Sequence, residues 1–205
     1  FDHQVKGEVV VPMAMVADWF LRACRAWLPN ESVSSLSGLR VLRPLRLGTF
    51  REKGAWLRIS VDRKDGQLKL LLSDSQGARF YAADGLMGSP QELDAPALDG
   101  EGWEGEIYAG PLFHGPAFQM IRSIGSVSEN GMQADLVGCE ALQWPAERWN
   151  LDPAAVDGCL QLALLWTQQQ LKRHSLPMSI AGIDLGRASG RITCCRLIGQ
   201  KASGS

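Results

Sequence analysis

The 205-residue chain has no excess of either charge: 21 lysines and arginines accompany 22 aspartates and glutamates, giving a net charge of −1. The missing basic excess excludes the electrostatic pattern expected of a protein that binds nucleic acid or an anionic membrane. No apolar run is long enough to span a bilayer, and no secretory signal pattern is visible. We therefore expect a cytoplasmic protein that binds neither nucleic acid nor membrane.

The chain has no C-x-x-C motif, although it contains five cysteines. An odd number of cysteines with mostly apolar neighbours is typical of reduced thiols in a cytosolic protein. Cys194 and Cys195 fall in a predicted strand, where adjacent side chains point to opposite faces, which argues against a shared metal site. The five cysteines are Cys24, Cys139, Cys159, Cys194 and Cys195.

Two long apolar helices are the clearest local prediction. The first covers 13–28 and lies between Pro12 and Pro29, residues that favour a helix start and a helix stop. The second covers 153–172, with Asp152 as its N-cap. Because both helices are apolar over most of their circumference, other structure must surround them.

Alternating apolar residues and turn dipeptides such as Asp65-Gly66 and Asn130-Gly131 predict antiparallel strands after each helix. This repeated pattern indicates a duplicated α+β unit in which a curved sheet wraps each helix. We expect an N-terminal unit at 1–88, a linker at 89–102 and a C-terminal unit at 103–205, with further strands outside both ends of the sequence. The predicted strands cover 39–47, 55–61, 68–72, 78–83, 103–109, 118–128, 132–137, 178–185 and 191–198.

Three clusters contain residues that could act in acid–base catalysis or line a binding pocket. The first is His3, Gly7 and Pro12, spaced H-x3-G-x4-P. A histidine has the pKa of a general base, and the amides of the following helix start, at 12–15, favour an oxygen that gains negative charge. A histidine before a strand is nevertheless more often structural.

The second cluster is Asp157 and Gln161, which share one face of the second helix. Apolar neighbours raise the pKa of a carboxyl group, as a general acid requires, and Gln161 could orient that group. The alternative is a solvated polar stripe that continues through Gln168 and Lys172.

The third cluster surrounds His114 in the sequence FHGPAFQ. Gly115 and Pro116 form a rigid turn, and Phe113 and Phe118 could wall a pocket. The alternative is an ordinary turn with two phenylalanines in the core.

In order, HQVKGEVVVP, GPAF, DPAAVDGCLQ and LPMS resemble motifs of the dehydratase domain of type I polyketide synthases. That family carries H-x3-G-x4-P, Y-G-P-x-F, D-x3-Q/H and L-P-F-S. The resemblance extends from Asp2 to about Leu185, and it is greatest to iterative synthases that make polyunsaturated fatty acids and enediyne polyenes.

The resemblance implies a double hotdog fold and removal of water from a β-hydroxyacyl chain, giving a trans-α,β-enoyl thioester. His3 would remove the α-proton, Asp157 would protonate the leaving hydroxyl, and Gln161 would hold Asp157. It implies no metal or organic cofactor, since the phosphopantetheine of acyl carrier protein carries the substrate. Implied partners are acyl carrier protein, neighbouring synthase domains and a second copy in a homodimer. The implied substrate-binding residues are Gly7, Pro12, Met13, His114, Gly115, Pro116, Phe118, Leu176, Pro177 and Met178.

Three positions depart from the family pattern. Met13 replaces a glycine, His114 replaces the tyrosine of Y-G-P-x-F, and Met178 replaces the phenylalanine of L-P-F-S. Four alternatives remain open: a double-bond isomerase, a product-template cyclase, a non-catalytic structural or carrier-docking domain, and a hotdog thioesterase.

Overall fold

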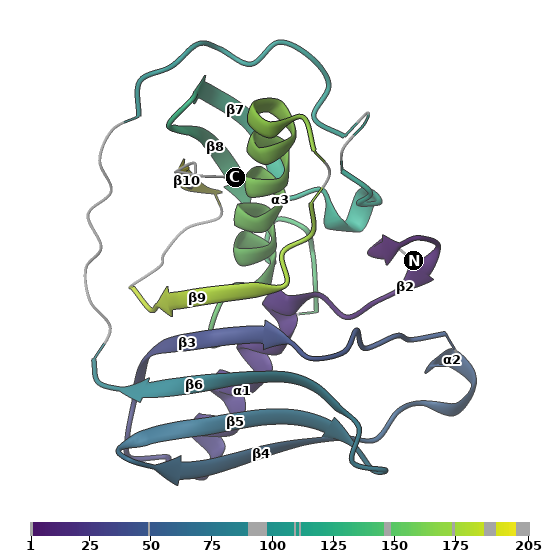
Figure 1. Ribbon diagram of the computed structural model, residues 1–205, viewed down its shortest axis with the longest axis vertical. Coiled ribbons are helices and arrows are strands. Elements are labelled where there is room, and N and C mark those ends of the chain that lie inside the picture. The colour runs from purple at the N-terminus through teal and green to yellow at the C-terminus, as the bar shows by residue number, and fades with distance from the viewer. Residues whose placement is uncertain are drawn as a thin grey trace.

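A computed structural model describes residues 2–48, 50–89, 98–108, 110, 112–145, 149–173, 175–186 and 192–199. Two long helices, α1 (Met13–Trp27) and α3 (Pro153–Leu171), contact each other, and each packs against an antiparallel sheet (Figure 1). Both helices were predicted to within one residue. The middle of the predicted linker, 90–97, lies outside the described residues. No helix among the described residues is long and apolar enough to cross a membrane.

The larger sheet has five strands in the order β4-β5-β6-β3-β9 and packs against α1. Strand β9 comes from the second half of the sequence but pairs with β3, so this sheet draws on both predicted units. A short helix, α2 (Phe50–Lys53), connects β3 to β4. The strands are β3 (Val33–Val41), β4 (Leu57–Lys64), β5 (Gln67–Asp74), β6 (Arg79–Met87) and β9 (Ser179–Asp184).

The smaller sheet has the order β10-β8-β7 and packs against α3 (Figure 1). Gly158 lets the helix approach this sheet closely, because a Cβ there would lie 3.0 Å from side-chain atoms of both Leu136 and Met120. The close approach removes the neighbouring face of α3 from water. The strands are β7 (Ile121–Ser128), β8 (Gly131–Val137) and β10 (Ile192–Ile198).

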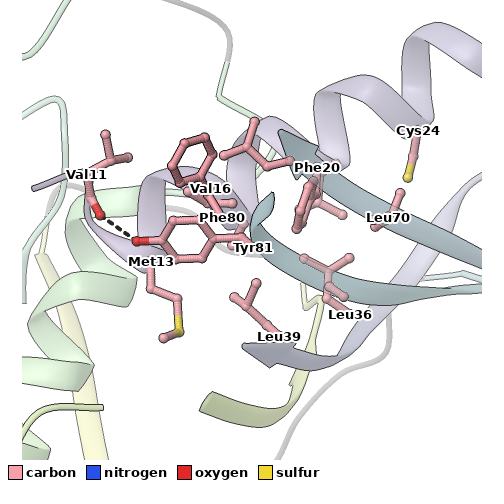
Figure 2. Packing of buried hydrophobic residues seen from close by; sticks show 14 of the residues in the cluster. Val11, Met13, Val16, Phe20, Cys24, Leu36, Leu39, Leu70, Phe80 and Tyr81 are labelled. Carbon is pink, nitrogen blue, oxygen red and sulfur yellow. Dashed lines mark hydrogen bonds between the residues drawn. The ribbon is translucent and has the colours of Figure 1, made fainter. Parts of the chain in front are cut away.

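Apolar residues of α1 pack against the larger sheet and form a buried cluster (Figure 2). Val16 and Phe20 of α1 are fully buried, as are Leu36 and Leu39 of β3. The only polar contact drawn in this core joins Tyr81, whose hydroxyl donates to the Val11 carbonyl at 2.9 Å. This bond ties β6 to the segment that leads into α1.

The predicted strand over 103–109 is wrong. Residues 103–108 form no strand, and Ala109 lies outside the described residues. Trp103, Ile107 and Tyr108 pack instead on the core beside α3, which explains their apolar pattern. Another predicted strand, over 39–47, is displaced, because β3 spans Val33–Val41.

Candidate active site

A short hairpin at the start of the chain positions His3. Strands β1 (Gln4–Val5) and β2 (Glu8–Val9) are joined by Lys6 and Gly7, whose φ angles are 53° and 80°. Glycine suits this left-handed turn because it has no Cβ. The turn brings Val10 back to His3, and the Val10 amide donates to the His3 carbonyl at 3.2 Å. The hairpin therefore explains why a glycine lies four positions after His3.

The imidazole of His3 is held in one tautomer. Its Nδ1 lies 3.0 Å from the Val10 carbonyl oxygen, which can only accept a hydrogen bond, so Nδ1 carries the proton. Burial lowers the pKa of His3, which favours the neutral ring. Nε2 of a neutral ring in this tautomer has a free lone pair, as a base requires.

Backbone pairing brings His3 to the second half of the chain. His3 forms an antiparallel bridge with His114, and the Gly115 amide donates to the Asp2 carbonyl at 2.7 Å. A Cβ on Gly115 would lie 2.9 Å from the Asp2 Cα, so a larger residue would separate the two segments. The ring of Phe118 lies 5.4 Å from that of His3, between centroids.

Helix α3 carries Asp157 and Gln161 on its buried face. The Asp152 carboxylate caps this helix by accepting from the Ala154 and Ala155 amides, both at 3.0 Å, as predicted for the N-cap. Asp157 and Gln161 are only 3% and 1% exposed, so the solvated-stripe alternative is wrong for both. The predicted hydrogen bond is present, because Gln161 Nε2 donates to Asp157 Oδ2 at 2.7 Å. Burial outweighs this bond and raises the pKa of Asp157 to about 6.

His3, His114 and Asp157 form one compact group. One nitrogen or oxygen of each lies within 4.8 Å of the others, and His114 Nε2 is 3.8 Å from Asp157 Oδ2. Burial, together with repulsion from His3 whenever that ring is protonated, lowers the pKa of His114 to about 4, so His114 is neutral near neutral pH. Within the described part of the chain, only this cluster of three groups could hold a metal ion. Ligands of a tetrahedral zinc ion are closer together, at about 3.4 Å, so the side chains would have to move inward to bind one.

A cavity of about 190 Å³ adjoins this group and is lined by both halves of the chain. Five expected substrate-binding residues line it: Met13, His114, Leu176, Pro177 and Met178. The other five expected substrate-binding residues are not among the residues that line it: Gly7, Pro12, Gly115, Pro116 and Phe118. His3, Asp157 and Gln161 also line the cavity.

The N-terminus of α1 lies at the same cavity. Pro12 is the N-cap residue, and no side chain caps this helix. The first amides of a helix have no partner within it, so they favour an oxygen with negative charge. Met13 begins α1 and lines the cavity.

Sequence reasoning missed Tyr108. Its hydroxyl donates to Gln161 Oε1 and accepts from the Ile121 amide, both at 2.8 Å. Tyr108 lies in the segment that we expected to be a strand. No motif spacing relates it to Gln161, 53 positions later, so the sequence alone offers no signal for this contact.

A second buried carboxylate fixes α1 against the start of α3. Asp18 Oδ1 accepts from the amides of Asn150 and Leu151 at 2.8 and 3.2 Å. Its Oδ2 pairs with Arg22 Nε at 2.9 Å. Through these bonds α1 holds the loop that precedes the helix of Asp157.

The fold is that of known dehydratases. The chain aligns with the dehydratase domain from the CurF module of curacin polyketide synthase at a TM-score of 0.76 and 15% identity, covering 98% of this chain and 78% of that one. An inactive mutant of CurJ dehydratase, with histidine replaced by phenylalanine, gives a TM-score of 0.71 and 16% identity, covering 98% and 75%. A trans-acyltransferase polyketide synthase enoyl-isomerase gives 0.65 and 15%, covering 97% and 81%. These likenesses show the double hotdog fold that the motifs implied.

The sequence comparison gives the family. None of the curated proteins matches the chain. The family model described as the polyketide synthase dehydratase N-terminal domain matches residues 85–196, more than half of the chain. The chain therefore belongs to the polyketide synthase dehydratase family.

Proposed function

We propose that the chain removes water from a β-hydroxyacyl thioester carried on acyl carrier protein and releases a trans-α,β-enoyl thioester. One observation carries this proposal: a neutral histidine and a buried carboxyl group with a raised pKa face one apolar cavity, although they come from opposite halves of the chain. Elimination of water needs a base and an acid in this arrangement, and groups with separated roles are expected at such sites.

His3 acts as the base in this proposal. Its Nε2 takes the α-proton, which the thioester carbonyl acidifies, while the bond from Nδ1 to Val10 keeps the ring in place. The amides at the start of α1, which no side chain caps, stabilise the negative charge that develops on the carbonyl oxygen.

Asp157 acts as the acid. It gives its proton to the β-hydroxyl group as the C–O bond breaks, so one water leaves and a C=C bond forms. The raised pKa of Asp157 keeps part of the population protonated at mildly acidic pH. In this proposal His114, which is neutral and lies 3.8 Å from the Asp157 carboxylate, binds the leaving hydroxyl group.

The partners follow from a tethered substrate. Leu176 and Met178 line the cavity and are 44% and 55% exposed, so we place the entrance for a pantetheine arm beside them. We propose acyl carrier protein and neighbouring synthase domains as partners, no metal or organic cofactor, and a homodimer within the synthase. We also propose that this synthase is iterative, of the polyunsaturated fatty acid or enediyne type.

Double-bond isomerisation is the second candidate, because an enoyl-isomerase shares the fold at a TM-score of 0.65. Dehydration lowers the mass of the acyl chain by one water, whereas isomerisation leaves its mass unchanged. Incubation with β-hydroxyacyl and with enoyl pantetheine thioesters separates them: a dehydratase removes one water from the first, whereas an isomerase only moves the double bond of the second.

A further inference from the structure

We infer that Tyr108 is a positioning residue for the acid: its hydroxyl fixes the Gln161 side-chain amide, and Gln161 in turn sets the protonation of Asp157. The inference rests on the proposed function for its kinetic meaning. Its physical basis is a continuous chain of hydrogen bonds that ends at Asp157.

The donors and acceptors in this chain have fixed directions. The Ile121 amide donates to the Tyr108 oxygen, and the Tyr108 hydroxyl has one proton left to donate. That proton goes to Gln161 Oε1 at 2.8 Å. Burial raises the pKa of Tyr108 to about 12, so the hydroxyl stays protonated at every pH at which the enzyme would be assayed.

The Gln161 amide has no remaining freedom. Its Oε1 accepts from Tyr108, while Nε2 donates to the Phe118 carbonyl at 2.8 Å and to Asp157 Oδ2 at 2.7 Å. Gln161 is 1% exposed, so water cannot replace a lost partner without rearrangement. The orientation that presents the amide nitrogen to Asp157 is therefore supported from both ends.

Removing the Tyr108 hydroxyl takes away one of the hydrogen bonds that fix the Gln161 side chain. Gln161 Oε1 becomes a buried acceptor without a donor, which is costly, so the side chain must move to find another partner. Movement weakens the bond from Nε2 to Asp157, a bond that stabilises the carboxylate. Tyr108→Phe should therefore favour the protonated form of Asp157.

The test compares pH profiles. In Tyr108→Phe, the alkaline limb of kcat/KM should shift upward by up to about one pH unit. Its kcat should fall, because Gln161 no longer holds the Asp157 carboxyl group in place. Its KM should change little, because the substrate contacts remain. The matched control is Tyr81→Phe, which removes the chain's other tyrosine hydroxyl, bonded to Val11 and not to Gln161. An equal shift of the alkaline limb in that control would overturn the inference.

A double substitution tests whether the effect passes through Gln161. In a Gln161→Ala background, Tyr108→Phe should cause no further shift of the alkaline limb, because the connecting amide is already gone. An additional shift of the same size would show that Tyr108 acts by another route and would contradict the inference.

A carboxyl carbon NMR titration of Asp157 separates this inference from the proposed function. An upward change of the Asp157 pKa in Tyr108→Phe supports the positioning role even if no water is removed from any substrate. An unchanged Asp157 pKa overturns the role even if the enzyme is an active dehydratase.

Discussion

His3 and Asp157 are 154 positions apart in the sequence, yet a ring nitrogen of the first and a carboxylate oxygen of the second lie within 4.8 Å of each other. Two features hold them there. A backbone bridge joins His3 to His114, and Gly158 lets α3 pack tightly on the smaller sheet. The double hotdog thereby places a base and an acid from different halves on one cavity.

Asp157→Asn should remove most of the dehydration while making the fold more stable. Asparagine keeps an oxygen that accepts from Gln161 but has no acidic proton, so we expect a loss of about 10²–10⁴-fold in kcat. Mass spectrometry of the thioester products measures the loss. A variant that turns over normally would contradict the role of Asp157 as the acid.

The stability gain in Asp157→Asn should depend on pH. The folded-state pKa of about 6 lies above the usual 3.8, so the folded protein holds the proton more tightly and loses stability as pH rises through this interval. At pH 7 the charged side chain costs about 2–3 kcal/mol, which asparagine avoids. Urea unfolding at neutral pH and below the usual aspartate pKa should show the gain only at neutral pH. An equal gain at both pH values would contradict this origin.

The pH profile of kcat/KM should peak on the acidic side of neutrality. The base must be neutral, and the pKa of His3 lies below 6.5. The acid must be protonated, and the pKa of Asp157 is about 6. Activity should therefore fall at lower pH as His3 gains a proton, and at higher pH as Asp157 loses one. A rate that is still rising at pH ~8 would contradict these assignments.

Gly7→Ala should lower activity more than its effect on stability would suggest. An alanine at φ 80° is strained by about 1–2 kcal/mol, and relief of that strain alters the hairpin that pairs His3 with Val10. Gly48→Ala is the control, because Gly48 has no left-handed φ and nothing lies within 4 Å of its added Cβ. Thermal unfolding and turnover of both variants test this; equal effects would show that the turn conformation is unimportant.

Asp18→Ala should destabilise the protein by about 2–4 kcal/mol, since it leaves two backbone amides of the loop before α3 without their acceptor. Arg25→Ala is a milder change at the same loop, because it removes only an exposed 3.3 Å bond to Asn150. It should cost less than about 1 kcal/mol. Urea unfolding measures both, and similar losses would contradict the importance of the buried carboxylate.

The sequence predicted those elements whose causes are local. Proline residues and continuous apolar stretches set the limits of α1 and α3, and the Asp65-Gly66 turn, with both φ angles positive, joins β4 to β5 as expected. The raised pKa of Asp157 and its bond to Gln161 also followed from the helix sequence.

Other features depend on the tertiary structure. Tyr108 appeared to belong to a strand because it packs on a core, and its hydrogen bond to Gln161 could not be inferred from spacing. Strand β9 joins the sheet of the first half by pairing with β3, a long-range contact that no local pattern in the sequence indicates. We expected Phe118 to wall the pocket, but it is not among the residues that line the cavity. Its carbonyl accepts from Gln161, and its ring contacts His3 and Trp144.

The most direct test is mass spectrometry of β-hydroxyacyl pantetheine thioesters incubated with the protein and, in parallel, with His3→Ala. Circular dichroism of both proteins establishes that the fold is retained. The account predicts loss of one water with the unaltered protein and none with His3→Ala. Equal loss of water in His3→Ala would contradict the assignment of His3 as the base, and no loss with any substrate chain length in the unaltered protein would contradict the dehydratase activity.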